Sequence, residues 1–410
     1  MFNTLEDYDF HGKKTILRVD FNVPLDKHGN VVNDKRIRAA LPSIKYLLSK
    51  GARLILLTHV GRPKGQVVEE LRTHGIAKRL SAILGRDVRK LSDVMGEHVK
   101  EEINAMKDGE IILLENIRFY KQEKGNDEFF AKQLAELADV YVNDAFGVAH
   151  REHTSVVGIP KHLPSCAGFI IENEIKMLNK AIENPKRPYV AIVGGAKEDK
   201  IKAIKNLLPK VDHLIISGKL ANTFLKAKGV NIGASAYDEN ALLEAREILA
   251  LAEGKIILPK DVIIADRFHN EARIQTMAIE NIPTEWMALD VGPETIRIYK
   301  QLLDTAETIV WTGPIGVFEL EQFANGTKQV AFAVAASNAT TIIGGGDSAA
   351  AIEKYNLQEH MSIVSTGGGA SLKILQGKTL VGIDALRENK HRNNPARVSP
   401  AELSQMEYYV

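Results

Sequence analysis

The chain has 410 residues, and its 53 Lys and Arg against 52 Asp and Glu leave a net charge of +1. That balance argues against a nucleic-acid-binding protein, because such proteins usually carry a larger excess of positive charge. Hydrophobic residues make up 45% and charged residues 26%, which excludes a globally disordered chain and a fibre.

The start of the chain, MFNTLEDYDFHGKK, is acidic and lacks the apolar stretch of a secretory signal. No run of about 18 apolar residues occurs, so we expect no membrane span. The single cysteine, Cys166, excludes an intrachain disulfide and a multi-cysteine zinc site, and it fits a reducing, cytoplasmic setting. At about 150 residues per domain, the length predicts two to three domains.

The first half of the chain alternates short apolar runs with helical patterns. A connection between parallel strands needs a dozen or more residues, usually a helix, so this alternation predicts parallel βαβ units. The expected strands are Thr15–Val19, Arg53–Leu57, Glu110–Leu114 and Val140–Val142, and the helical stretches between them include Ile37–Ser49, Leu71–Leu84 and Asp127–Ala138.

A helical pattern at Glu172–Glu183 separates this half from a second set of strands. Pro185 and Pro188 follow it, and proline cannot continue a helix, so we expect an interdomain helix within residues 171–188. The strand–helix alternation then restarts. The second set of expected strands is Tyr189–Val193, His213–Ser217, Thr308–Trp311, Thr341–Ile343 and Ser362–Val364.

The repeated alternation predicts an α/β protein with two doubly wound, Rossmann-like domains, each a parallel sheet flanked by helices. We expect the domains at residues 1–170 and 189–380, followed by a tail at residues 381–410. The tail ends in Tyr408, Tyr409 and Val410. On its residues alone it is either a frayed terminus or a segment that packs back onto the first domain.

Polar side chains follow the expected strands of the first domain, and four of these strand ends bring in arginine. Ligands of doubly wound sheets bind beyond the carboxyl ends of the strands. One arginine there is more often a solvated surface charge, but arginines after four strands predict a site for a small polyanion, because guanidinium forks match phosphate and carboxylate. The residues concerned are Asp20, Asn22, Arg36, Arg38, His59, Arg62, Arg118 and Arg151.

The strand ends of the second domain carry glycines instead, in loops at residues 194–200, 312–319, 344–348 and 365–371. Glycine lets the backbone approach a ligand closely, and a helix N-terminus offers free N–H groups to phosphate. One Gly-Gly pair is weak support, but several such loops with Lys197, Lys200 and Asp347 predict a nucleotide site. Asp347 is the candidate ligand of Mg²⁺, which typically takes one or two carboxylates plus phosphate oxygens.

Other nucleotide and metal motifs are absent from the sequence. It contains no G-x-x-x-x-G-K-[ST], no G-x-G-x-x-G after the first strand and no H-E-x-x-H, which excludes a P-loop and argues against a dinucleotide fingerprint. His150 and His153 have a spacing that suits a shared zinc ion, but no further ligand cluster accompanies them. Local polar contacts are the expectation for both histidines.

The strings at these strand ends closely resemble those of one family, the phosphoglycerate kinases. They occur in the family's order, several are seven or more residues long, and together they cover Arg18 to Gly377. The first-domain strings are Arg18–Pro24, Arg36–Ile44, Thr58–Gly65, Leu113–Tyr120 and Asn143–Arg151, and the second-domain strings are Gly194–Lys197, Gly313–Glu319, Gly344–Ser348 and Ser365–Leu372.

The resemblance implies a hinge-bending kinase of glycolysis and gluconeogenesis that moves a phosphoryl group reversibly between 1,3-bisphosphoglycerate and ADP, giving 3-phosphoglycerate and ATP. It implies that the tail at residues 381–410 returns to the first domain. The implied phosphoglycerate positions are Asp20, Asn22, Arg36, His59, Arg62, Arg118 and Arg151. The implied ADP or ATP positions are Gly195, Lys197, Lys200, Gly316, Glu319, Gly344, Gly345, Gly346, Asp347 and Ser348, with Glu319 at the ribose hydroxyls and Asp347 on Mg²⁺.

Seen from ATP, the nucleophile of this reaction is a carboxylate that is already ionised at pH 7, so no general base is required. The remaining catalytic work is alignment and neutralisation of charge. We expect Arg36 and Lys197 to do this, with backbone N–H groups of Gly345 and Gly368 as further donors. The expected partners are the small-molecule substrates, with no nucleic acid and no membrane, and a monomer is expected over a dimer.

The sequence departs from the family's pattern near the nucleotide. Lys197 and Lys200 are three residues apart rather than four, a spacing that still keeps two side chains on one helix face. Thr312 occupies a position where the family usually has asparagine, and Lys219 one where it usually has glycine. These two differences leave the nucleotide preference open.

Two other classes of protein stay open. A carboxylate-activating ligase would depend on an amine or thiol acceptor. An inactive nucleotide-binding scaffold is expected to have lost Lys197, Arg36 or Asp347, all of which are present.

Overall fold

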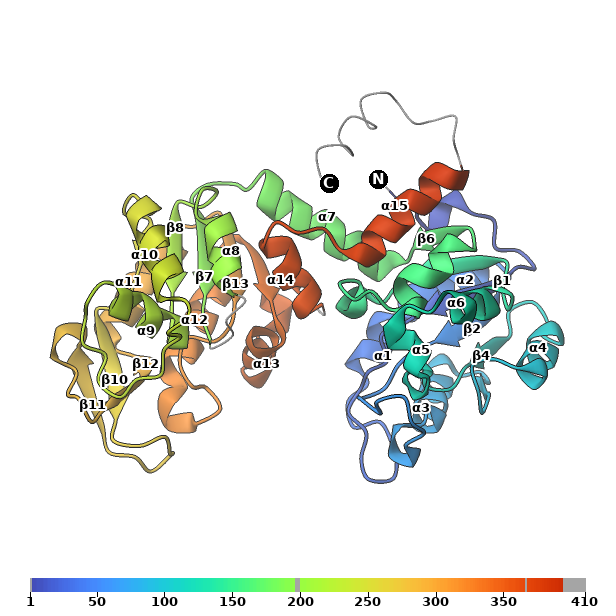
Figure 1. Cartoon of the computed structure of the whole chain (residues 1–410), viewed down its shortest axis with the longest axis horizontal. Helices are drawn as coiled ribbons and strands as arrows, with labels where there is room; N and C mark the ends of the chain where they lie inside the picture. Colours follow the sequence, from blue (N-terminus) through green and yellow to red (C-terminus); the bar gives the residue numbers. More distant parts are fainter. Residues whose placement is uncertain (1, 196–199, 366, 394–410) are drawn as a thin grey trace. The chain divides into compact units, whose positions relative to one another are not determined.

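The computed structural model describes residues 2–195, 200–365 and 367–393, and these fall into two compact units. Unit 1 comprises the chain up to Ile175 together with the described residues from Thr379 onward, and unit 2 comprises Lys176–Lys378. Each unit contains one parallel sheet with helices around it (Figure 1). None of the helices in the described ranges is long and apolar enough to cross a bilayer.

Unit 1 is built on a six-stranded parallel sheet in the order β3-β4-β2-β1-β5-β6. The four strands expected from the sequence are present. β3 and β6 were not expected, because strands of two and three residues leave no apolar run long enough to recognise. The strands are β1 (Lys14–Arg18), β2 (Arg53–Leu57), β3 (Arg89–Lys90), β4 (Ile111–Leu113), β5 (Val140–Asn143) and β6 (Ser165–Ala167).

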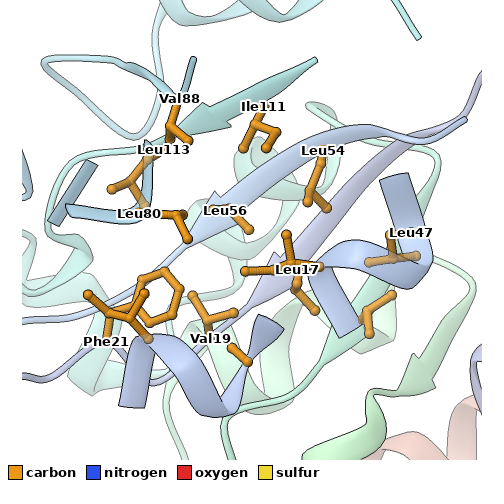
Figure 2. Close-up of a cluster of buried hydrophobic side chains, with 14 of the residues drawn as sticks. Leu17, Val19, Phe21, Leu47, Leu54, Leu56, Leu80, Val88, Ile111 and Leu113 are labelled. Atoms are coloured by element: carbon orange, nitrogen blue, oxygen red, sulfur yellow. The ribbon is translucent and has the colours of Figure 1, made fainter. Parts of the chain in front are cut away.

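Hydrophobic side chains cover both faces of this sheet, as expected for parallel strands. Successive strand residues point to opposite faces, so Leu17 and Leu54 belong to one cluster while Ile16 and Ile55 belong to another. Figure 2 shows the first cluster, in which Leu17 lies among side chains of β2, β4 and the neighbouring helices. The helices of unit 1 are α1 (Lys35–Ala39), α2 (Leu41–Ser49), α3 (His74–Leu84), α4 (Glu97–Asn104), α5 (Lys121–Gly125) and α6 (Glu128–Ala135), with α15 (Val381–Asn393) from the end of the described chain.

The helix expected over Ile37–Ser49 is two helices, α1 and α2. Pro42 lies in the first turn of α2, where its missing N–H costs nothing, whereas inside one continuous helix it would break a hydrogen bond. The chain therefore ends α1 at Ala39 and begins α2 at Leu41. This break places Arg36 on a short helix of its own directly after the β1 loop.

Unit 2 repeats the architecture with the strand order β15-β14-β13-β7-β8-β9, again parallel throughout. The five strands expected from the sequence are present, and β9 is additional. The strands are β7 (Tyr189–Val193), β8 (His213–Ile216), β9 (Ile256–Ile257), β13 (Thr308–Thr312), β14 (Thr340–Gly344) and β15 (Ile363–Val364). The helices are α8 (Lys200–Leu207), α9 (Gly218–Ala227), α10 (Leu242–Leu251), α11 (Pro293–Asp304), α12 (Asn325–Ala336), α13 (Gly346–Lys354) and α14 (Gly369–Leu375).

Unit 2 also contains a small antiparallel sheet in the order β11-β10-β12, which the sequence analysis did not predict. β10 (Asp261–Ala265) lies in the centre, between β11 (Ile274–Ala278) and β12 (Met287–Val291). The residues of β11 are almost all exposed, so it lacks the alternation of buried and exposed residues that marks a half-buried strand. Its exposure explains why the sheet was missed.

The helix between the two sets of strands is α7 (Phe169–Glu183), which begins three residues before the expected Glu172. Its N-terminus is held by unit 1, because Phe169 N donates to Ser43 Oγ at 3.0 Å and Ile170 N donates to Asp144 Oδ1 at 2.8 Å. These two acceptors satisfy N–H groups that a helix leaves without internal partners.

The described part of the tail contains α15, which packs against unit 1. Ser165 N donates to Asn389 Oδ1 at 2.9 Å, and Asn389 Nδ2 donates to Pro160 O at 2.6 Å. Residues 394–410, including Tyr408 and Tyr409, lie outside the described residues.

Candidate active site

The strand orders create one topological switch point in each parallel sheet. In unit 1 the switch point is at β1, which has β2 as its neighbour on one side and β5 on the other. In unit 2 it is at β7, which has β8 as its neighbour on one side and β13 on the other. Ligands of doubly wound sheets bind at such points, beyond the carboxyl ends of the strands. The residues predicted from the sequence follow β1, β2, β4 and β5 in unit 1, and β7, β13, β14 and β15 in unit 2.

The loop after β2 joins two of the residues predicted in unit 1. Gly61 N donates to Asn22 Oδ1 at 2.8 Å, and Arg118 Nη1 donates to Gly61 O at 2.7 Å. The loop backbone therefore holds Asn22, which follows β1, and Arg118, which follows β4, at one edge of the sheet. Arg62 is exposed, and no hydrogen bond or ion pair joins it to these residues in the part of the chain that the structure describes.

Asp20, Arg36 and His59 form a second group at the same edge. Arg36 Nη1 donates to Asp20 Oδ2, and Asp20 Oδ1 lies 3.9 Å from His59 Nε2. Burial, reinforced by the positive charges of Arg18 and Arg118, holds the pKa of His59 well below its usual value. The imidazole is therefore neutral at pH 7 and serves as a hydrogen-bonding group rather than as a cation.

Positive charge exceeds negative charge in this region, which we call the arginine cluster (Arg18, Arg36, Arg118 and Arg151). Arg118 is only 4% exposed, yet its Nε and Nη2 have no hydrogen-bond partner, and neither has Nε of Arg151. Burial, together with the charges of Arg18 and Arg151, lowers the pKa of Arg118 to about 10. Among the described residues, no carboxylate forms an ion pair with Arg118 or Arg151, whereas Arg36 is paired with Asp20. An anion bound here would satisfy these donors and supply the missing counter-charge.

Arg18 was not singled out from the sequence, although it lies at the centre of the cluster. It is the last residue of β1, it is completely buried, and its Nη2 lies 3.1 Å from His59 Nδ1. One signal for it existed. An arginine within the apolar run Thr15–Val19 must be buried with a partner or a ligand, because an unpaired charge in a sheet core is costly.

Unit 2 contains a cavity of about 740 Å³ at its switch point. Apolar side chains such as Met287, Leu289 and Val317 form much of its lining, which suits a flat, uncharged ring system. Among the residues predicted from the sequence, the lining includes Gly195, Gly316, Glu319 and Asp347, and it also includes Lys219.

A smaller cavity of about 200 Å³ lies where the loops after β13, β14 and β15 meet. Asp347 lines both cavities, so they share this wall. Its side chain is exposed, in the first turn of α13. The other predicted residues around the smaller cavity are Lys200, Gly345, Gly346, Ser348 and Gly368.

Lys200 is buried, and its Nζ donates to Gly194 O at the end of β7 and lies 3.5 Å from Thr312 O at the end of β13. A Cβ atom on Gly194 would lie 2.1 Å from Pro314 O, so only glycine lets these two loops approach. Lys197, the other predicted lysine, lies outside the described residues.

The loop between β14 and α13 presents backbone to the smaller cavity. Gly345 has φ +96° and precedes the helix, a conformation that favours glycine. Ser348 Oγ donates to Gly344 O at 3.0 Å and accepts from Gly313 N at 2.5 Å, which joins the β13 and β14 loops. Gly368, with φ +44°, precedes α14 in the same way. The N-termini of α13 and α14 thus border the smaller cavity, and helix N-termini favour an anion such as phosphate.

Asp290 is a buried residue of the larger cavity's wall that sequence analysis missed. It accepts hydrogen bonds from Val291 N at 2.9 Å and from Gly326 N at 2.7 Å, and burial raises its pKa to about 7. A Cβ atom on Gly316 would lie 2.2 Å from Asp290 Oδ1. Asp290 therefore packs closely against Gly316, where only a residue without a side chain fits.

Comparisons with known proteins agree on one family. The sequence model of the phosphoglycerate kinase family matches residues 5–378. The chain is 53% identical over 389 residues to the phosphoglycerate kinase of Moorella thermoacetica and 50% identical over 389 residues to that of Herpetosiphon aurantiacus, covering in each case 94% of this chain and 99% of the relative.

Solved structures of phosphoglycerate kinases also resemble this chain over most of its length. The phosphoglycerate kinase of Coxiella burnetii is 41% identical with a TM-score of 0.86, covering 95% of this chain and 99% of that one. The enzyme of Pyrococcus horikoshii is 34% identical with a TM-score of 0.83, covering 96% and 100%. These findings confirm both the resemblance stated from the sequence and the predicted two-sheet α/β fold.

Proposed function

Because this chain belongs to the phosphoglycerate kinase family and transfers a phosphoryl group reversibly between 1,3-bisphosphoglycerate and ADP, we propose that its two units divide the two substrates between them. Unit 1 binds the phosphoglycerate at the arginine cluster. Unit 2 binds ADP or ATP at the two cavities beyond β7, β13 and β14.

The single observation that carries this assignment is the excess of buried positive charge in unit 1. Arg118 keeps two guanidinium nitrogens without partners in a site where Arg18, Arg36 and Arg151 also gather. A phosphoglycerate presents both phosphate and carboxylate, the two groups that guanidinium forks bind best. Asp20, Asn22 and His59 provide polar contacts around these anions, and Arg62 is an exposed cation on the adjoining loop.

For the nucleotide, the apolar larger cavity suits the base and the glycine-rich smaller cavity suits the phosphates. Glu319, an exposed carboxylate on the larger cavity's lining, is our candidate for the ribose hydroxyls. Gly195, Gly316, Gly344, Gly345, Gly346, Ser348 and Lys200 bound the ligand, with Lys197 expected near the phosphates from the sequence pattern. Lys219 lines the larger cavity and adds a positive charge beside the nucleotide.

The residues of unit 2 fit a magnesium ion that arrives with the nucleotide. In the described residues, no group of three or more His, Cys, Asp or Glu side chains forms a metal cage. Mg²⁺ typically uses only one or two carboxylates plus phosphate oxygens, and Asp347 offers a carboxylate where both cavities meet. Asp347 would hold the ion, which when bound neutralises phosphate charge.

In the transfer, the 3-phosphoglycerate carboxylate attacks the terminal phosphoryl group, or the acyl phosphate yields it to ADP. Arg36 and Lys197 neutralise charge on the moving group, and the N–H groups of Gly345 and Gly368 donate to its oxygens. The reacting atoms must come within about 3 Å of each other, so binding of both substrates draws the units together about a hinge. Exclusion of water then protects the acyl phosphate from hydrolysis.

The enzyme acts on small molecules and needs neither nucleic acid nor membrane. We propose a monomer in the cytoplasm, a compartment whose reducing conditions the single cysteine fits.

A coupled assay tests the proposal. ADP formation should require both ATP and 3-phosphoglycerate, should need no amine or thiol acceptor, and should disappear when Mg²⁺ is chelated. Turnover that depends on an added amine or thiol would instead indicate a ligase, and turnover in the absence of Mg²⁺ would remove the role given to Asp347.

A further inference from the structure

A buried carboxylate of unit 1 has no part in the mechanism above, although it is connected to the arginine cluster. Glu123, in α5, has no exposed surface. Ser155 N donates to Glu123 Oε2 at 2.9 Å, and Ser155 Oγ donates to Oε1 at 2.7 Å. His153 Nδ1 lies 3.6 Å from the same Oε1. Burying an ionised carboxylate is costly, so its partners are expected to matter.

Ser155 connects this carboxylate to Arg18. Arg18 Nε donates to Ser155 Oγ at 2.8 Å. A hydroxyl has one proton, which here goes to Glu123, and it can accept the guanidinium proton through a lone pair. Tyr141 OH donates to Ser155 O at 2.6 Å and fixes the backbone of this residue. Two hydrogen bonds through the Ser155 hydroxyl therefore connect the buried guanidinium of Arg18 to the buried carboxylate of Glu123.

Arg18 in turn determines which nitrogen of His59 carries the proton. Arg18 Nη2 lies 3.1 Å from His59 Nδ1. A guanidinium can only donate, so Nδ1 must accept and be unprotonated. In the neutral ring the proton then resides on Nε2, the nitrogen that lies 3.9 Å from Asp20 Oδ1. The opposite tautomer would turn a lone pair, instead of a donor, toward a bound anion.

We propose that Glu123 and Ser155 are positioning residues that hold Arg18 so that His59 is fixed as the Nε2–H tautomer and presents a neutral donor to the bound phosphoglycerate. This inference rests on the proposed function, because it places the phosphoglycerate at the arginine cluster. The arrangement also explains the charge distribution of the cluster. The negative charge of Glu123 offsets the positive charge of Arg18, and that of Asp20 offsets the charge of Arg36. The positive charges of Arg118 and Arg151 are then left to attract the ligand.

We call the chain of contacts from Glu123 through Ser155 and Arg18 to His59 the relay. Two variants of the full-length protein test it without removing charge. Ser155→Ala deletes only the bridging hydroxyl, and Arg18→Lys keeps the positive charge but loses the fork that reaches Ser155 and His59 together. Thr154→Val is the matched control. It removes the neighbouring buried hydroxyl, which donates to Gln122 O at 2.8 Å and accepts from Asp127 N at 2.9 Å.

The first readout is the tautomer of His59, measured by long-range ¹H–¹⁵N NMR at pH 7. The parent and Thr154→Val should show a protonated Nε2 and an unprotonated Nδ1, whereas Ser155→Ala and Arg18→Lys should show mixed tautomers. In Ser155→Ala the KM for 3-phosphoglycerate should rise roughly tenfold, the effect of losing one hydrogen bond to a charged group, with the KM for ATP unchanged. A purely structural role for Ser155 would lower the melting temperature and leave the tautomer as it is.

A parent enzyme with the proton on Nδ1, or a Ser155→Ala variant with the parental tautomer and KM, would overturn the relay. Titration of the parent with 3-phosphoglycerate separates this failure from failure of the proposed site. If saturation leaves the His59 resonances unmoved, the anion binds elsewhere and both proposals fall. If the resonances move while the tautomer is unaffected by both variants, only the relay is wrong.

Discussion

Units 1 and 2 use the same sheet architecture to build two different kinds of candidate binding surface. In unit 1 the strand ends carry arginines, and four of them gather around one neutral histidine. In unit 2 the corresponding strand ends carry glycines beside a cavity of about 740 Å³ with a largely apolar lining. The buried ionisable side chains of the two candidate sites also differ: unit 1 buries the basic Arg118, whereas unit 2 buries the acidic Asp290.

The switch point of a doubly wound sheet sets where a ligand is expected to bind, whereas the residues at the strand ends set what kind of ligand would fit. Under the proposed assignment, unit 1 would recognise its ligand by charge, because Arg118 and Arg151 form no ion pair with a carboxylate among the described residues. Unit 2 would recognise its ligand by the shape of its cavities and by backbone N–H groups, at positions where glycine lets the backbone approach closely. The following experiments test this contrast.

The largest expected effect comes from Arg118→Met, which removes a buried guanidinium and keeps an unbranched apolar side chain. Loss of a charge-assisted, desolvated contact should lower kcat/KM for 3-phosphoglycerate by about 10²-fold or more, while the KM for ATP stays near the parental value. Steady-state kinetics with each substrate varied in turn measures both. Arg53→Met is the control, because Arg53 lies at the opposite end of β2 and pairs with Asp108 at the surface. Equal losses for both substrates would contradict charge recognition confined to unit 1.

A smaller effect is expected from Gly316→Ala in unit 2. The new Cβ would lie 2.2 Å from Asp290 Oδ1 and 2.7 Å from Phe323 O, so the loop beside the larger cavity must shift. We expect the KM for ATP to rise roughly tenfold with little change in calorimetric binding of 3-phosphoglycerate, since a shift of about 1 Å near a site commonly costs one to two orders of magnitude. Gly125→Ala, where a Cβ meets nothing within 4 Å, is the control. Unaltered ATP kinetics would show that the loop does not bound the nucleotide.

The last prediction concerns stability rather than substrate kinetics and follows from Asp290. Its pKa is raised to about 7 in the folded protein, against roughly 3.9 in an unfolded chain. Between these values the native state keeps a proton that the unfolded state has released, so this group makes the free energy of unfolding fall as pH rises from about 4 to 7, by at most ~1.4 kcal/mol per pH unit.

Asp290→Asn should remove that slope from unit 2. Both tryptophans of the chain, Trp286 and Trp311, lie in unit 2, so urea unfolding followed by tryptophan fluorescence at several pH values reports on this unit. The parent should lose stability relative to the variant on going from pH 5 to pH 7. A constant difference between the two proteins would show that Asp290 does not titrate in this window.

Much of the fold was predictable because buried parallel strands leave continuous apolar runs, such as Arg53–Leu57 and Tyr189–Val193. The short strands β3, β6 and β9 were not, since two or three residues carry no period. β11 has five residues, but it was not predicted because most of them are exposed and show no alternation of buried and exposed positions. Pro42 was a signal for the break between α1 and α2. The helical spacing of apolar residues continues on both sides of Pro42, however, and so it indicated a single helix.

The site was predictable to the extent that it depends on strand ends, because parallel strands bring their carboxyl ends to one edge. Arg36, His59 and Arg118 were predicted in this way, and the structure places them at one edge of the sheet. The hydrogen bonds through Ser155 could not be predicted from the sequence. Ser155 is 137 positions from Arg18 and 32 positions from Glu123, and no motif marks either contact. Side-chain partners of this kind follow from packing and not from local pattern.

Hydrogen exchange of the full-length enzyme, measured with each substrate alone, tests the division of the substrates most directly. With 3-phosphoglycerate, peptides that carry the loops after β1, β2, β4 and β5 should gain protection while unit 2 is unaltered. With ADP and Mg²⁺, the loops after β13, β14 and β15 should gain protection while the arginine cluster exchanges as before. Protection of unit 2 by 3-phosphoglycerate, or of the arginine cluster by the nucleotide, would contradict the assignment of one substrate to each unit.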